Sequence, residues 1–156
     1  MNVYIKRVVR RLNIKMASYP WDSWCQGTAT ASTFFTKLAV IGAGNPPALW
    51  GRHPTTNNID LNYFSKTCAL IDNETVNDLY RDGLHDGSDK YIFVKVVDFS
   101  DTGKCAVARG RGSYDKNHFL IFSGKKVIIA GVIHENVAAP VAANYLGSLA
   151  NQLQNM

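Results

Sequence analysis

The chain has 156 residues, of which 46% are hydrophobic and 19% are charged. This length suits one domain, and a chain this apolar can bury enough surface to exclude wholesale disorder. No stretch approaches the roughly 18 consecutive apolar residues that cross a bilayer. We therefore expect one folded domain without a transmembrane segment.

The N-terminus is strongly basic. The formal charge is +5, and the excess is concentrated before the first acid, Asp22. We predict a basic segment over 1–17 followed by a single domain over 18–156. Such a segment attracts polyanions, although a solvated basic face is an equal alternative. It resembles a mitochondrial presequence in composition and lacks the apolar core of a secretory signal, so no compartment is assigned. Its basic residues are Lys6, Arg7, Arg10, Arg11 and Lys15.

The first half of the domain is predicted to contain a loop, a helix and a long connection. Residues 18–24 combine turn formers with aromatic residues and indicate a loop. A helix is predicted from just after Cys25 to near Gly42, because its apolar residues recur at helical intervals. Residues 45–68 have few periodic apolar positions and are typical of an irregular connection with at most one short strand.

The second half is predicted to be mainly strands. A short helix is expected to open at 72–75 and to end at Gly83. A C-terminal helix is expected over 136–153, with Pro140 in its first turn. The order of these predicted helices and strands therefore indicates an α+β fold with an antiparallel meander between an N-terminal and a C-terminal helix. The expected strands are 91–99, 104–109, 118–122 and 126–133.

Neither a metal nor a cofactor is expected. The three cysteines have no zinc-binding spacing, and their odd number favours a reducing compartment over a disulfide framework. Residues 37–44 imitate a dinucleotide-binding turn, but Pro47 stands where the third glycine is needed. Acidic residues over 72–89 lack the full spacing of a calcium loop. The segment Arg109-Gly110-Arg111-Gly112 is followed by a strand instead of a phosphate-binding helix, which favours an exposed glycine turn.

The strongest catalytic hypothesis pairs Cys25 with His118. A thiol at the start of a helix is stabilised as the thiolate, which is the nucleophilic form. His118 opens a strand and is a candidate general base. The candidates for orienting its ring are His134, Glu135 and Asn136. The alternative is that both residues are structural, with Cys25 packed in the core as a small apolar residue and His118 an ordinary residue of its strand. The candidate substrate-binding residues around Cys25 are Trp24, Gln26, Trp50 and His53.

The order of thiol, helix and later histidine strand resembles the papain-like NlpC/P60 and CHAP peptidoglycan hydrolases. The resemblance is carried by Trp24 to Gly27 with the following helix and by the run 117–125. It implies amide cleavage in a cell-wall stem peptide through an acyl-thioester, with Cys25 as nucleophile and His118 as base. Trp24 stands where these enzymes often carry aspartate or asparagine.

Two classes of function are therefore expected. The first is a cysteine amidase that acts on a peptide or cell-wall polymer. The alternative is a non-enzymatic protein that binds nucleic acid or another polyanion, or a phage or viral assembly subunit with a basic arm. Its candidate contacts are Lys6, Arg7, Arg10, Arg11, Arg109 and Arg111.

Overall fold

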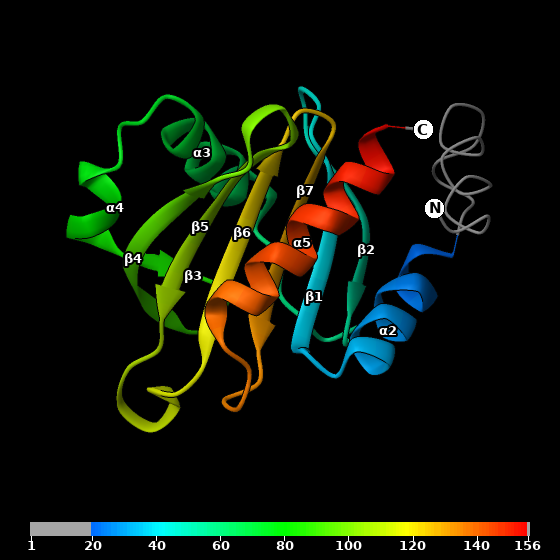
Figure 1. The fold of residues 1–156 in the computed structure, drawn as a ribbon, viewed down its shortest axis with the longest axis horizontal. Coiled ribbons are helices and arrows are strands. Elements are labelled where there is room, and N and C mark those ends of the chain that lie inside the picture. Colours follow the sequence, from blue (N-terminus) through cyan, green and yellow to red (C-terminus); the bar gives the residue numbers. More distant parts are fainter. Residues whose placement is uncertain (1–19, 156) are drawn as a thin grey trace.

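The computed structural model describes residues 20–155 as one curved antiparallel sheet with helices on both faces (Figure 1). The strand order is β2-β1-β7-β6-β5-β4-β3. The helices are α2 (Trp21–Ser32), α3 (Leu61–Asp72), α4 (Asn77–Asp82) and α5 (Ala139–Gln154), with short turns η2 (Ser100–Thr102) and η3 (Gly112–Tyr114). The strands are β1 (Phe35–Gly42), β2 (Ala48–His53), β3 (Leu84–His85), β4 (Lys90–Asp98), β5 (Gly103–Arg109), β6 (His118–Gly124) and β7 (Val127–Ile133). The predicted fold class is confirmed.

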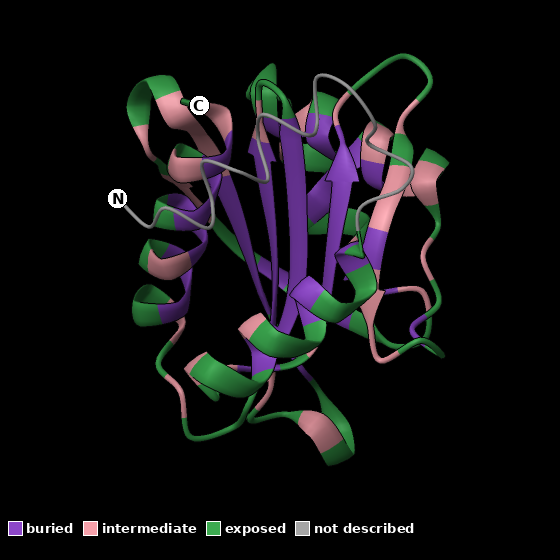
Figure 2. Cartoon of the chain, turned by 90° about the vertical axis from the view of Figure 1, so that its right-hand side faces the viewer, coloured by how far each residue is buried: buried purple, intermediate pink, exposed green. Residues whose placement is uncertain are grey.

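The sheet separates two hydrophobic layers. Helices α2 and α5 cover one face, and α3 and α4 cover the other. Side chains alternate between the layers: Leu120 and Phe122 of β6 face α5, whereas Phe119 and Ile121 face α3. Figure 2 shows that the central strands are buried and that the outer sides of the helices are exposed. Burial on both sides explains why these strands are almost continuously apolar.

Local chemistry sets the ends of the helices. Asp60 accepts a hydrogen bond from the Tyr63 amide at 3.0 Å and so caps the start of α3. Pro140 lies in the first turn of α5, where its missing amide hydrogen costs nothing. Helix α2 ends at Thr33, which has the left-handed φ of 58°. These ends place α2 directly before β1 and α5 directly after the β7 exit loop.

Helix α2 crosses the edge strand β2 at very short range. The register of β1 and β2 shifts between Val40 and Ile41, which leaves Trp50 as an extra residue. This bulge lets Trp50 and the next residue, Gly51, both face α2. A side chain at Gly51 would lie 2.5 Å from the main chain of Trp21. Glycine is therefore required at this crossing for steric reasons.

Several predicted boundaries in the first half are wrong. The first helix begins at Trp21 instead of after Cys25, so most of the predicted loop over 18–24 is helical where it is described. Residues 35–42 form β1 instead of continuing the helix. The supposed connection over 45–68 contains β2 and most of α3. Among these segments, β1 is the buried apolar run that was taken for a helix.

The second half matches the prediction closely. The four expected strands correspond to β4 to β7, and the C-terminal helix is α5. The short helix α4 ends at Asp82 before Gly83, as expected. Its start differs, because Asp72 ends α3 and α4 begins only at Asn77.

We predict that Gly51→Ala lowers the free energy of unfolding by about 1–3 kcal/mol, because the added methyl group overpacks the α2–β2 crossing. Urea denaturation measures this change. The matched control is Gly27→Ala in the exposed side of α2, where nothing lies within 4 Å of the added carbon. This variant should gain roughly 0.5–1 kcal/mol from helix propensity. Equal stability of the two variants would contradict the tight crossing.

Candidate functional site

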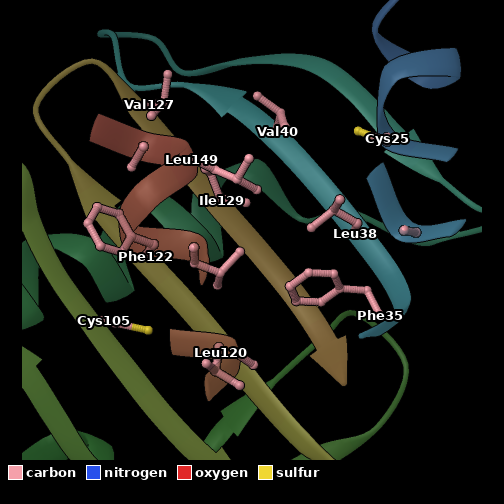
Figure 3. Close-up of a cluster of buried hydrophobic side chains, with 14 of the residues drawn as sticks. Cys25, Phe35, Leu38, Val40, Cys105, Leu120, Phe122, Val127, Ile129 and Leu149 are labelled. Atoms are coloured by element: carbon pink, nitrogen blue, oxygen red, sulfur yellow. The ribbon is translucent and has the colours of Figure 1, made fainter. Parts of the chain in front are cut away.

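Cys25 is a buried core residue. It lies in the second turn of α2, one turn past the free amides at the helix start, and its side chain is 0% exposed. Figure 3 places its sulfur on the side of α2 that faces β1, beside Val40. Burial, with a smaller effect of Asp22, raises the pKa of the thiol to about 12. Cys25 is therefore a neutral thiol at physiological pH. The prediction that it is a reactive thiolate is wrong.

His118 lies far from Cys25. Cys25 packs near Val40, which pairs with Ile129 of β7, and Ile129 pairs with Phe122 of β6. His118 is four residues from Phe122 along β6. The two positions on the sheet are therefore separated by about 13 Å along the strands and roughly 10 Å across them. This separation excludes a hydrogen bond between the thiol and the imidazole.

The other predicted catalytic residues gather near His118 instead of Cys25. His118 pairs with Ile133, directly before His134 and Glu135, which are both exposed. The predicted return of these residues beside His118 is therefore correct, but no nucleophile accompanies them. Burial and the charge of Arg109 lower the pKa of His118, so the ring is neutral at pH 7. Its Nδ1 has no hydrogen-bond partner within residues 20–155.

We predict that all three cysteines react very slowly with Ellman's reagent in the native protein at pH 8. Burial raises the pKa of Cys25, Cys68 and Cys105 to about 12 in each case, and the thiolate is the reactive form. The same three thiols should react promptly in guanidinium chloride. Rapid and selective labelling of native Cys25 would contradict this assignment.

All three tryptophans of the chain meet where α2 crosses β2. The rings of Trp21 and Trp50 are stacked with centroids 5.2 Å apart, and Trp24 meets Trp21 edge-on at 5.5 Å. Trp50 remains partly exposed, and its indole nitrogen is buried without an acceptor in the described part of the chain. We call Trp21, Trp24 and Trp50 the tryptophan cluster. Trp21 and Trp24 are buried, and Trp50 is the member that exposes part of its ring.

A second aromatic group joins α5 to the end of α2. Tyr145 meets Phe34 edge-on with ring centroids 5.2 Å apart, and Phe35 lies 6.0 Å from Tyr145. Phe34 and Tyr145 are partly exposed, and Val141, one turn earlier in α5, is 50% exposed. Partly exposed aromatic side chains therefore lie between the end of α2 and α5, on the face of the sheet that these two helices cover.

On the same face of the sheet, the side chains are less covered beyond α5, toward β4. Ile92 of β4 pairs with Arg109 of β5, and Arg109 pairs with His118 of β6. Ile92 and Val94 are 38% and 39% exposed, which is unusual for large apolar residues in a strand. We call Ile92, Val94, Arg109 and His118 the open-sheet patch. It combines apolar and cationic side chains, which suits a protein partner.

The remaining predicted contacts do not form one site. Gln26 is exposed on α2, whereas His53 ends β2 and is half-buried. Arg109 and Arg111 are exposed near the end of β5. The other predicted polyanion contacts, Lys6, Arg7, Arg10 and Arg11, lie outside the described residues. Within 20–155, no three His, Cys, Asp or Glu side chains converge as metal ligands, and no helix has the length and apolarity to span a membrane.

Comparison with known proteins decides the family. The sequence profile of the Profilin family matches residues 19–156. The chain belongs to the profilin family. No curated protein sequence matches it. The similarity to solved profilins is therefore structural, at low sequence identity.

Solved profilin structures share the fold over nearly their whole length. Profilin IA of Acanthamoeba castellanii has a TM-score of 0.66 and 17% identity, over 87% of this chain and 99% of the other. Human profilin II has a TM-score of 0.68 and 14% identity over the same shares. Mouse profilin IIa, solved with a double repeat from the FH1 domain of mDia1, has a TM-score of 0.67 and 14% identity, over 88% and 98%.

The family assignment corrects the expected functions. The predicted relation to NlpC/P60 and CHAP hydrolases is wrong, since the matched family and the solved structures are profilins. The predicted cysteine amidase activity on a peptide or cell-wall polymer is wrong as well. The physical reason is that Cys25 is buried and its thiol has a raised pKa. The profilin match likewise gives no support to nucleic-acid binding or viral assembly.

Sequence reasoning placed Trp21, Trp24 and Trp50 beside a proposed catalytic thiol, as residues that line a groove. The family match removes the catalytic part of that hypothesis. Phe34 and Tyr145 were not assigned to this site. The available signal was the concentration of all three tryptophans within residues 21–50 of this profilin. Partly exposed tryptophan is enriched at binding surfaces, because it combines a large apolar area with a hydrogen-bond donor.

Proposed function

We propose that this profilin binds proline-rich segments of the FH1 type through the tryptophan cluster. The observation that carries the proposal is the stack of Trp21 and Trp50, which holds two indole rings nearly parallel at the α2–β2 crossing. The solved mouse profilin IIa complex with an FH1 double repeat supports it. The ligand class is therefore a proline-rich peptide.

The chemistry of proline-rich peptides matches this cluster. Such peptides form a polyproline II helix, which has flat pyrrolidine rings and carbonyl groups without internal hydrogen bonds. Aromatic side chains pack against the rings, and the preformed helix loses little entropy on binding. Trp50 has an indole N–H without an acceptor within 20–155. This group is the natural donor to a peptide carbonyl once the ring adjusts to the ligand.

We predict that an oligoproline peptide binds the protein and that Trp50→Leu lowers its affinity by at least about tenfold, as expected for an aromatic hot spot. Leucine retains apolar packing against Gly42 but removes the flat ring and its N–H. Isothermal titration calorimetry measures both affinities, and circular dichroism checks the fold.

The matched control is Tyr80→Leu, which removes an aromatic ring that is 58% exposed on α4. This helix covers the opposite face of the sheet, so the oligoproline affinity should be unchanged. If oligoproline fails to bind the unmodified protein, or binds Trp50→Leu equally well, the proposed site is wrong.

A second proposal concerns actin, the other partner class of the profilin family. We propose that the open-sheet patch binds it. Exposed Ile92 and Val94 supply apolar area that α5 leaves uncovered, and Arg109 supplies a charge that orients a partner. This patch lies on β4, β5 and β6, whereas the tryptophan cluster lies on α2 and β2, so both ligands can bind together.

We predict that Ile92→Glu weakens binding to actin monomers by at least about tenfold, because it replaces apolar contact area with a carboxylate that must lose its water in the interface. Fluorescence anisotropy of labelled actin measures the affinity, and oligoproline binding should be retained. The charge-matched control is Asn62→Glu, an exposed position on α3. Unchanged actin affinity in Ile92→Glu would contradict the assignment of this patch.

A further inference from the structure

The loop between β5 and β6 projects beyond the end of the sheet (Figure 1). The Gly110 amide donates to the Asn117 carbonyl at 2.7 Å, which closes the base of the loop. Tyr114 anchors its middle, because its hydroxyl donates to the Lys90 carbonyl at 2.7 Å and its ring lies 5.4 Å from that of Tyr91. The fold therefore holds this loop at two points and leaves its tip outside.

The tip consists of Arg111, Gly112 and Ser113, and all three are exposed. Gly112 has a φ of +64°, and nothing lies within 4 Å of the carbon that a side chain would add. In the described part of the chain, the hydroxyl of Ser113 forms no hydrogen bond and the guanidinium of Arg111 forms no ion pair. These groups make no contribution to the fold and are available to another protein.

Arginines precede Ser113 by two and by four residues, at Arg111 and Arg109. Protein kinases commonly recognise their substrates by such a charge pattern. The arginine guanidinium groups of the substrate pair with carboxylates in the cleft of the kinase. Gly110 and Gly112 flank Arg111. The glycine at the tip lets the segment extend into a cleft at small steric cost.

We propose that Ser113 is a phosphorylation site for a serine kinase that selects arginine upstream of its target. In this step the Ser113 oxygen attacks the γ-phosphorus of ATP. A P–O bond to Ser113 forms, the bond to the bridging oxygen breaks, ADP leaves, and the hydroxyl proton passes to the base of the kinase. The products are phosphorylated Ser113 and ADP.

The modification would act on the open-sheet patch, and this part rests on the proposed actin binding. A phosphate adds about −1.5 to −2 charges at pH 7 and pairs strongly with arginine. Arg109 belongs to the patch, and Arg111 is two residues further along the chain. A phosphate on Ser113 therefore withdraws cationic charge from the edge of the patch and lowers its affinity for actin.

The test treats the full chain with ATP, Mg²⁺ and the catalytic subunit of the cAMP-dependent protein kinase, and maps phosphate by mass spectrometry. We expect phosphate on Ser113, none in Ser113→Ala, and an initial rate about tenfold lower in Arg111→Gln because one charge-assisted contact is lost. Ser88 is the internal control, since it is exposed without an upstream arginine. Phosphate on Ser88 instead of Ser113, or an undiminished rate in Arg111→Gln, would overturn the proposal.

The effect of phosphorylation on actin binding is measured separately. Phosphorylated protein should bind actin monomers several-fold more weakly, while its melting temperature stays the same because the Ser113 side chain is exposed. Equal actin affinity of the two forms would refute the regulation and leave the modification site intact. Failure of the unmodified protein to bind actin would instead refute the proposed function, because the mapping of phosphate does not depend on actin.

Discussion

The contact between Trp21 and the bulged strand β2 is the constraint on which the rest of this face depends. Gly51 lets the main chain of α2 come within a distance that any side chain would prevent, and Trp50 then stacks on Trp21. Asp22 adds to the contact by accepting a hydrogen bond from the Arg52 amide at 2.9 Å. This contact fixes α2 on the sheet, buries Cys25, and assembles the tryptophan cluster. A packing requirement thus produces the aromatic surface proposed to bind proline-rich ligands.

Both proposed binding surfaces lie on the face of the sheet that α2 and α5 cover. On one face, α5 buries its apolar side against β5, β6 and β7 and leaves surface free on both sides of itself. The tryptophan cluster lies toward β2, and the open-sheet patch lies toward β4. The other face is closed by α3 and α4 around Phe64, Phe93 and Phe119. Helix α5 therefore lies between the two proposed binding surfaces on this face.

The sequence predicted the second half of the fold well because its strands alternate with clear turn residues. It failed in the first half, where β1 is buried on both faces and has no alternation. The apolar positions at Phe34, Leu38 and Ala39 happened to match helical spacing. Placing the helix start after Cys25 instead of at Trp21, five residues too late, then put Cys25 at a reactive position. The long-range contact of Trp50 with Trp21 could not be foreseen, because it depends on a bulge that no local pattern reveals.

The central claim is that the partly exposed indole of Trp50, which stacks on the buried Trp21, receives a proline-rich ligand. The chain has three tryptophans, and all belong to the cluster, so incorporation of 5-fluorotryptophan places a ¹⁹F label on each of them. Titration with oligoproline should shift the resonance of Trp50 most, in a saturable manner. A glycine-serine peptide of equal length should shift none. Saturable binding of oligoproline that leaves all three fluorine resonances unmoved would contradict the account.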